Sequence, residues 1–94
     1  MKIYICGKSE EDLTRGEQFW QLNDHRAFSS NMVKFPFTDI EKKHFNFKII
    51  DMCDCIYMTK GWKSNERCKT ELAYAKAMGK LVKYEDMQWS LRKK

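Results

Sequence analysis

Glu71 is the residue of this sequence whose type and position best suit chemistry. It follows an apolar run that begins at Asp54, a polar loop that opens on Gly61 and Trp62, and the start of a stretch that predicts a helix over 64–78. In a parallel α/β sheet, ligands bind in the loops at the carboxyl ends of strands and at the first turns of the helices that follow. A carboxylate placed there is a candidate for catalysis. The alternative is that Glu71 is a solvated residue on a surface helix.

The four cysteines predict reduced thiols and no metal centre. Cys6, Cys53, Cys55 and Cys68 lie within apolar strand or helix patterns, which differ from the loop spacings of a secreted disulfide framework. Cys53 and Cys55 form a C-x-C pair, but a closed zinc site needs four ligands. We therefore expect neither a metal nor another cofactor.

Length and composition indicate a single domain over residues 1–94. The apolar share of 43% is enough for a core, and no stretch approaches the roughly 20 apolar residues of a membrane span. The first residues have no cleavage site of a secretory signal, so we expect a cytoplasmic protein that does not bind membranes. The net charge of +5 favours phosphate-bearing partners, although a solvated basic face would give the same charge.

Apolar periodicity predicts alternating strands and helices. We expect strands at 2–6, 31–37, 54–59 and 80–84, with Pro36 forcing an edge or end position on the second of them. Helices are expected at 11–27, from Thr38 or Asp39 to Met52, and at 64–78 with Gly79 as the stop. Residues 85–91 suggest one further helical turn. This order predicts a parallel, doubly wound sheet covered by helices on both faces.

Several of these segments resemble the nucleoside 2-deoxyribosyltransferase-like superfamily, and within it the domain of unknown function 4406 group. The resemblance rests on Lys2–Gly7, on the strand after Asp54, on Gly61-Trp62, and on Glu71–Ala75 followed by Gly79-Lys80. It implies a flavodoxin-like three-layer α/β sandwich with a small parallel sheet of about four strands. It also implies a reaction at the N-glycosidic bond of a deoxynucleoside, with no cofactor.

The resemblance assigns Glu71 as the nucleophile of that reaction, because a carboxylate can attack an oxocarbenium-like centre and hold the sugar as an ester. A second acid assists the leaving base, and many members carry an Asp for this purpose where this sequence has Asn46. An Asn can orient a ribose hydroxyl but has no titratable proton. The proton would then come from Asp51, Asp54 or a partner subunit, and we take Asp54 as the second catalytic candidate.

The loops supply the candidate ligand contacts. Relatives often place Ser and Gly-Ala between Gly-Trp and the Glu, where this chain has Asn65, Arg67 and Cys68. Losing that glycine hinders close approach of the backbone, but the guanidinium can contact a phosphate instead. The ligand-binding candidates are Gly7, Lys8, Ser9, Asn46, Gly61, Trp62, Asn65 and Arg67.

Three functions remain open from the sequence. The first is transfer or hydrolysis of an N-glycosidic bond in a nucleoside or nucleotide. The second is a non-catalytic module that binds a nucleotide or another phosphorylated small molecule in the same cleft. The third is a nucleic-acid or protein interaction domain that uses the basic second half, although nucleic acid is the less favoured partner. A homo-oligomer is left open.

Two placements can be tested directly in a structure. We expect Glu71 to point into a cleft beside Gly7. We also expect Cys6 and Cys68 to lie near one another at the mouth of that cleft, with Cys68 the more reactive thiol because it is near a helix N-terminus and Arg67.

Overall fold

Four parallel strands form the central sheet, in the order β2-β1-β3-β4. The structure is a computed structural model that describes residues 1–32 and 38–85. The strands are β1 (Lys2–Cys6), β2 (Arg26–Ser29), β3 (Cys55–Met58) and β4 (Leu81–Tyr84). The helices are α1 (Glu10–Leu22), α2 (Asp39–Met52) and α3 (Glu66–Ala77), with short 3-10 turns η1 (Ser30–Met32) and η2 (Trp62–Ser64).

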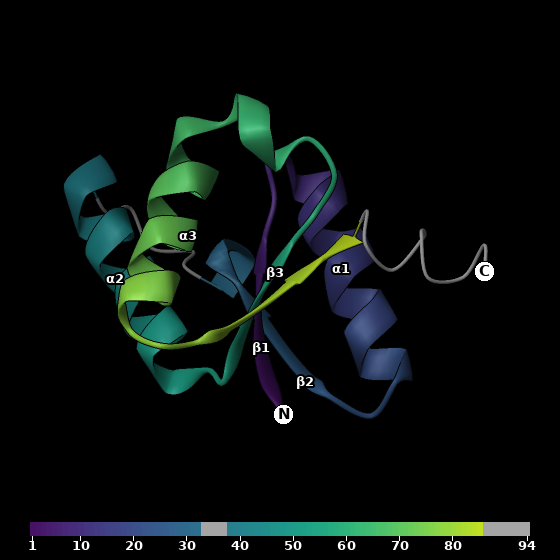
Figure 1. Ribbon diagram of the computed structural model, residues 1–94. Coiled ribbons are helices and arrows are strands. Elements are labelled where there is room, and N and C mark those ends of the chain that lie inside the picture. The colour runs from purple at the N-terminus through teal and green to yellow at the C-terminus, as the bar shows by residue number, and fades with distance from the viewer. Residues whose placement is uncertain (33–37, 86–94) are drawn as a thin grey trace.

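Helices cover both faces of this sheet, with α1 on one side and α2 and α3 on the other (Figure 1). The alternation of side chains along β1 explains the two layers of core, because successive residues of a strand face opposite ways. Ile3 and Ile5 pack with Leu13 and Trp20 of α1. Tyr4 and Cys6 belong to the cluster on the side of α2 and α3. The predicted flavodoxin-like three-layer sandwich with four parallel strands is confirmed.

The second strand is not where the sequence predicted it. Helix α1 ends at Leu22, since Asn23 caps it and Asp24 adopts a left-handed turn with φ of 62°. The chain then enters β2 at Arg26, within the segment that we expected to end the helix, and Arg26–Ser29 pairs with Lys2–Ile5. Part of the expected strand at 31–37 is instead the turn η1, and residues 33–37 lie outside the described residues.

Helix α2 begins and ends as predicted. Thr38 and Glu41 form a capping box at its start, in which each side chain accepts from the other residue's backbone N–H. Of its expected inward positions, however, Ile40, Phe45 and Met52 are exposed. The apolar pattern was misleading there because the buried face of α2 carries Asn46 together with Ile50.

Helix α3 begins later than predicted, because Asn65 caps it by accepting from the backbone N–H of Cys68. The residues before the cap form η2, which starts after Gly61 in a left-handed conformation with φ of 84°. Leu72 and Ala75 face inward as expected, but Met78 is exposed. Of the helical turn expected over 85–91, only residue 85 is described. None of the described helices is long and apolar enough to cross a membrane.

Candidate functional site

Glu71 lies in the second turn of α3, with its side chain turned inward against β1. Only 1% of the residue is exposed. Its Oε1 accepts from the Tyr4 hydroxyl at 3.1 Å and from the Cys6 thiol at 3.2 Å. Its Oε2 accepts from Asn46 Nδ2 at 3.2 Å. The carboxylate is therefore held by donors from β1 and α2. It is not solvated on a surface helix, but it is buried and does not point into an open cleft as we expected.

Arg67 covers the remaining side of that carboxylate. Its Nη1 lies 3.3 Å from each oxygen of Glu71, one helical turn further on. Its Nη2 donates to the carbonyl oxygen of Gly7, which follows β1. Burial alone lowers the pKa of the guanidinium, but the Glu71 carboxylate raises that pKa above its ordinary value. Arg67 is thus a fixed positive charge that joins α3 to the loop after β1 and lies beside Gly7, where we expected the cleft.

The titratable donors Tyr4 and Cys6 stay protonated at ordinary pH. Burial and then the Glu71 carboxylate raise the pKa of Tyr4 well above its usual value. The hydrogen bond with Cys68, burial and the Glu71 carboxylate raise the pKa of Cys6. Both side chains therefore serve as neutral hydrogen-bond donors that orient the carboxylate.

Cys6 and Cys68 do lie together, since the Cys6 thiol is 3.9 Å from the carbonyl oxygen of Cys68. Both are fully buried, however, so the expected position at the mouth of the cleft is wrong. The inward face of α3 carries Cys68 into the core beside Leu72 and Ala75. Faster modification of Cys68 than of the other thiols stays a prediction.

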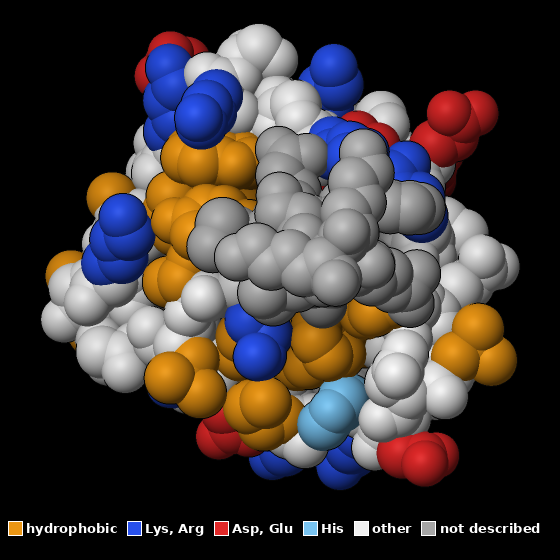
Figure 2. Space-filling view, turned by 45° about the vertical axis from the view of Figure 1, so that its right-hand side comes forward, with side chains coloured by type: hydrophobic (Ala, Val, Ile, Leu, Met, Phe, Trp, Pro, Cys, Tyr) orange, Lys and Arg blue, Asp and Glu red, His pale blue; other side chains and the backbone are white. Residues whose placement is uncertain are grey.

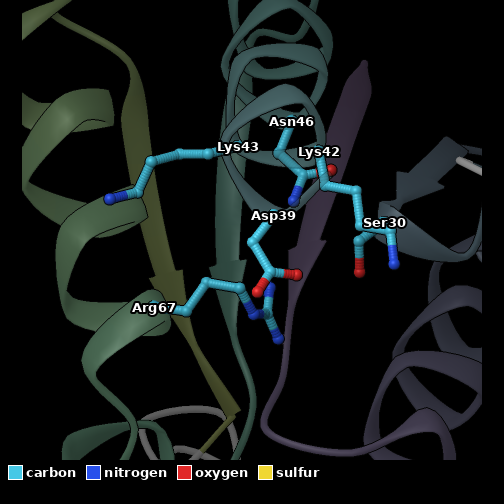
Figure 3. A pocket seen from close by; sticks show the side chains of 6 residues that line it. All are labelled: Ser30, Asp39, Lys42, Lys43, Asn46 and Arg67. Carbon is cyan, nitrogen blue, oxygen red and sulfur yellow. The ribbon is translucent and has the colours of Figure 1, made fainter. Parts of the chain in front are cut away.

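A cavity of ≈ 430 Å³ lies in front of Arg67 and Asn46. It is lined by Ser30, Asp39, Lys42, Lys43, Asn46 and Arg67. Figure 3 shows the Lys42 side chain extending toward Ser30 and that of Lys43 extending toward α3, with the Arg67 guanidinium lying below Asn46. Asn46 and Arg67 form the wall between this cavity and the Glu71 carboxylate, because both line the cavity and both contact Glu71.

Asn46 presents an unsatisfied acceptor at this wall. Its amide nitrogen must face Glu71, because a carboxylate only accepts hydrogen bonds. That contact fixes the orientation of the amide, and Asn46 Oδ1 then has no hydrogen-bond partner among the described residues although the residue is only 3% exposed. A buried carbonyl oxygen without a partner is costly, so this atom is suited to a donor supplied by a ligand.

A second cavity of ≈ 460 Å³ lies at the crevice between β1 and β3, where the strand order reverses. It is lined by Lys8, Asp12, Arg15, Lys60, Gly61 and Glu85. Crevices of this kind bind ligands in many open α/β sheets. Fold topology thus points to this cavity and the chemistry of Glu71 points to the first. We favour the first, because its wall contacts the buried carboxylate, whereas Asp12 and Glu85 of the second are already paired with Arg15.

The predicted ligand-binding residues accordingly divide into groups. Asn46 and Arg67 line the first cavity, and Lys8 and Gly61 line the second. The others have structural contacts: Ser9 caps α1, Asn65 caps α3, and the Trp62 ring lies 5.8 Å from that of Tyr84. Gly7 contributes its carbonyl oxygen to Arg67.

The structure does not bring Asp54 to this site. Asp54 precedes β3, and its carboxylate accepts from the backbone N–H of Lys2 at 3.0 Å, at the amino edge of the sheet. Glu71 contacts Cys6 at the carboxyl end of β1, so about 13 Å of strand separates the two edges. Asp51 is also held elsewhere, by the Tyr74 hydroxyl at 2.6 Å. The expectation that Asp54 assists Glu71 is corrected accordingly.

Sequence reasoning missed several residues of the site, namely Ser30, Asp39, Lys42, Lys43 and the donor Tyr4. It placed Cys6 near the site but did not predict its hydrogen bond to Glu71. One signal was present: Asp39, Lys42 and Asn46 recur at the spacing of one helical face. The described residues contain no group of three or more His, Cys, Asp or Glu side chains that could hold a metal ion.

Comparison with known proteins gives a family and a fold. A family model described as a domain of unknown function, DUF4406, matches residues 1–84. The sequence matches no curated protein at a significant level. Among solved structures, the fold is similar to that of a 2-deoxyribosyltransferase from Leishmania mexicana, with a TM-score of 0.65 and 20% sequence identity. The match covers 88% of this chain and 62% of that one, so this chain spans less than two thirds of the length of the enzyme.

Proposed function

The chain belongs to the DUF4406 family, and on that premise we propose that it binds a nucleoside or nucleotide in the cavity beside Asn46 and cleaves its N-glycosidic bond. Glu71 is the nucleophile. One of its oxygens bonds to C1′ of the sugar while the bond from C1′ to the base breaks, and the base leaves with that electron pair. Water then hydrolyses the glycosyl ester, or a second base accepts the sugar.

The observation that supports this proposal is the set of contacts that holds Glu71. A nucleophile must be kept in one orientation, and the donors Tyr4, Cys6 and Asn46 do this from two different elements. The side of the carboxylate nearest the cavity is covered by Arg67, whose side chain is 37% exposed. The Glu71 carboxylate can therefore reach C1′ of a sugar in the cavity only if the Arg67 side chain moves.

The residue that we propose to assist the leaving base differs from those that the sequence suggested. Asn46 has no proton to give, and Asp54 is at the other edge of the sheet. Asp39 is the carboxyl group that lines the cavity, so we assign it to the departing base. Exchange of Asp39 for Asn tests this assignment separately from that of Glu71.

A non-catalytic nucleotide-binding module is the second candidate function, and one observation favours it. Both oxygens of Glu71 already accept hydrogen bonds, and 1% of the residue is exposed. The same contacts would be found if the carboxylate only joined α3 to β1 and α2. In that case the cavity binds its ligand and Glu71 is structural.

The interaction-domain alternative has less support. On the face shown in Figure 2, lysine and arginine side chains are scattered among acidic and hydrophobic ones. Binding to a nucleic-acid backbone favours a continuous basic strip. We carry forward the two small-molecule functions, because the cavity beside Asn46 offers a site for them.

Base release separates these functions. Purified protein is incubated with each common deoxynucleoside and its 5′-monophosphate, and free base is quantified by chromatography. We expect the variant Glu71→Gln to lose activity by about 10³-fold or more, because the amide keeps the shape but lacks the nucleophile. Glu66→Gln is the matched control on the same helix, since its side chain is 90% exposed.

Three results would decide the matter. Base release that is equal in wild type and Glu71→Gln rejects the mechanism. Release that survives Glu66→Gln and disappears in a folded Glu71→Gln protein supports it. Tight binding of one ligand by calorimetry, with no base released by any form, supports the binding module.

A further inference from the structure

The cavity beside Asn46 has more positive than negative charge. Of the residues that the structure describes, Lys42, Lys43 and Arg67 line it, against the single carboxylate of Asp39. Arg67 is already paired with the buried Glu71, so the surplus comes from the two lysines. Among the described residues, no ion pair engages Lys42 or Lys43. Two unpaired ammonium groups in one concave site favour an anionic ligand.

Arg67 is placed to be shared between Glu71 and such an anion. Its contacts with the Glu71 oxygens are long, at 3.3 Å, and come from a single nitrogen. Its planar guanidinium has five N–H donors, which allows it to bind a carboxylate and a phosphate or to exchange one for the other. An anion in the cavity would compete with Glu71 for this group.

A second, independent observation indicates that the cavity receives a ligand with a hydrogen-bond donor. The oxygen of the buried Asn46 amide has no partner among the described residues, and its orientation is fixed by the bond from Nδ2 to Glu71. A phosphomonoester dianion has no O–H to donate to this oxygen, whereas a sugar hydroxyl on the same molecule does. The ligand therefore combines an anionic group with a hydroxyl or amino group.

We infer that the cavity is built for a phosphomonoester, so that the ligand is a nucleoside monophosphate and not a free nucleoside. The phosphate lies between Lys42 and Arg67, beside the Ser30 hydroxyl, and the sugar hydroxyl donates to Asn46 Oδ1. When the phosphate binds, Arg67 turns from Glu71 toward it, which uncovers the carboxylate. The nucleoside part of this inference rests on the proposed function, whereas the phosphate part rests on the charges of the cavity.

Calorimetric titration with matched ligands tests the inference. The ligands are a deoxynucleoside, its 5′-monophosphate, deoxyribose 5-phosphate and inorganic phosphate. The proteins are wild type, Lys42→Gln and Lys48→Gln, where Lys48 is an exposed lysine of the same helix that does not line the cavity. We expect the monophosphate to bind at least about tenfold more tightly than the nucleoside, because a charge-assisted hydrogen bond is worth about one factor of ten.

Lys42→Gln should remove most of that preference, and Lys48→Gln should leave it unchanged. Glu71→Gln should bind the monophosphate more tightly than wild type does, since Arg67 then has no competing carboxylate. Binding of deoxyribose 5-phosphate as tight as that of the nucleotide would identify a sugar phosphate as the source of the anion, and would overturn the assignment to a nucleotide.

The remaining outcomes separate this inference from the proposed catalysis. Equal affinities for nucleoside and monophosphate, equal effects of the two lysine variants, or no binding of any monophosphate would overturn the inference. If Glu71-dependent base release from nucleosides accompanies equal affinities, catalysis stands and the phosphate site does not. If monophosphates bind selectively through Lys42 but no form releases base, the phosphate site stands and catalysis does not.

Discussion

At the scale of single residues, the pair Glu71 and Asn46 decides what the site can do with protons. The amide donates to the carboxylate at 3.2 Å, so position 46 supplies a neutral donor to Glu71 and no second acid. A carboxylate at 46 would put two acids within hydrogen-bond distance in a buried place, and such a pair shares one proton. Asn46 therefore orients the Glu71 carboxylate and supplies no titratable proton at this position.

The substitution Asn46→Asp tests this trade-off. We expect the new acid to share a proton with Glu71, which raises the pKa of the pair. If leaving-group assistance limits the reaction, base release should rise by about 10²-fold and fall again as the pH increases through that raised pKa. The measurement is the pH profile of base release for both proteins.

Asn65→Asp is the matched control, because it makes the same chemical change at a helix cap where Asp is equally suitable. An unchanged rate for Asn46→Asp, with ligand binding intact, would show that proton donation is not the missing function. A rise in the rate of base release in both variants would attribute the effect to the added negative charge instead of to a proton donor at position 46.

At the scale of elements, the local signals in the sequence determined which predictions held. Helix α2 was correctly bounded because its capping box lies within four consecutive residues. Strand β2 was missed because Arg26–Ser29 is short and has only Ala27 and Ser29 buried, so its pattern differs little from that of a helix end. Local sequence does not show that it pairs with β1, which is a tertiary contact.

The residues of the site also divide into those that local sequence could place and those that only tertiary contacts bring there. The strand–loop–helix order led us to expect Glu71 beside Gly7, and in the structure Arg67 connects the two residues by contacting both. The same order explains why Asp54 lies far from Glu71. Asp54 is at the start of a parallel strand, whereas Glu71 contacts the carboxyl end of β1, at the opposite edge of the sheet. Lys42 could not be assigned from its neighbours, because only the packing of α2 beside Ser30 and Arg67 forms the cavity.

The packing of α1 on the sheet makes a prediction at this scale. An added Cβ at Gly16 would lie 2.6 Å from Ile5 Cγ2, so the helix approaches β1 too closely for any side chain. Gly16→Ala should therefore destabilise the protein by about 1–3 kcal/mol through overpacking, although alanine favours an isolated helix. Urea unfolding followed by circular dichroism measures the change.

Gly79→Ala is the comparison variant for this prediction. An added Cβ at Gly79 meets no atom within 4 Å, but the residue has φ of +74° after α3. Its cost should be about 1 kcal/mol and should come from the backbone alone. A Gly16→Ala protein as stable as wild type would show that α1 can move away from the sheet without cost.

At the scale of the whole molecule, an ion-pair network joins helix α1 to the residue after β4 at the carboxyl edge of the sheet. Arg15 of α1 contacts Glu85, which follows β4, with both Nε and Nη2 at 2.9 Å. The same guanidinium contacts Asp12, and the backbone N–H of Lys60 donates to Glu85. Helix α1 is thereby fastened to the loops after β3 and β4, which together surround the second cavity.

This network predicts a pH dependence of folding stability. Burial raises the pKa of Glu85, but the hydrogen bonds from Arg15 and from the Lys60 backbone lower it more, so the folded-state pKa lies below the ordinary value of 4.5. A carboxyl with a lowered pKa binds protons more weakly in the folded state. Its stabilising contribution is therefore complete above about pH 4.5 and is lost as the pH falls through the folded-state value.

Glu85→Gln should consequently lower the melting temperature at pH 7, and the gap between variant and wild type should close as the pH falls from 4.5 through the folded-state pKa of Glu85. The loss at pH 7 should be about 1 kcal/mol, because Arg15 is 47% exposed and solvent screens the pair. Thermal unfolding between pH 3 and 8 measures both proteins, with Glu66→Gln as the control for an exposed ion pair. A gap that stays constant over this range would mean that the ionised carboxylate of Glu85 does not fasten α1 to the end of β4, and that shape alone holds the edge of the sheet together.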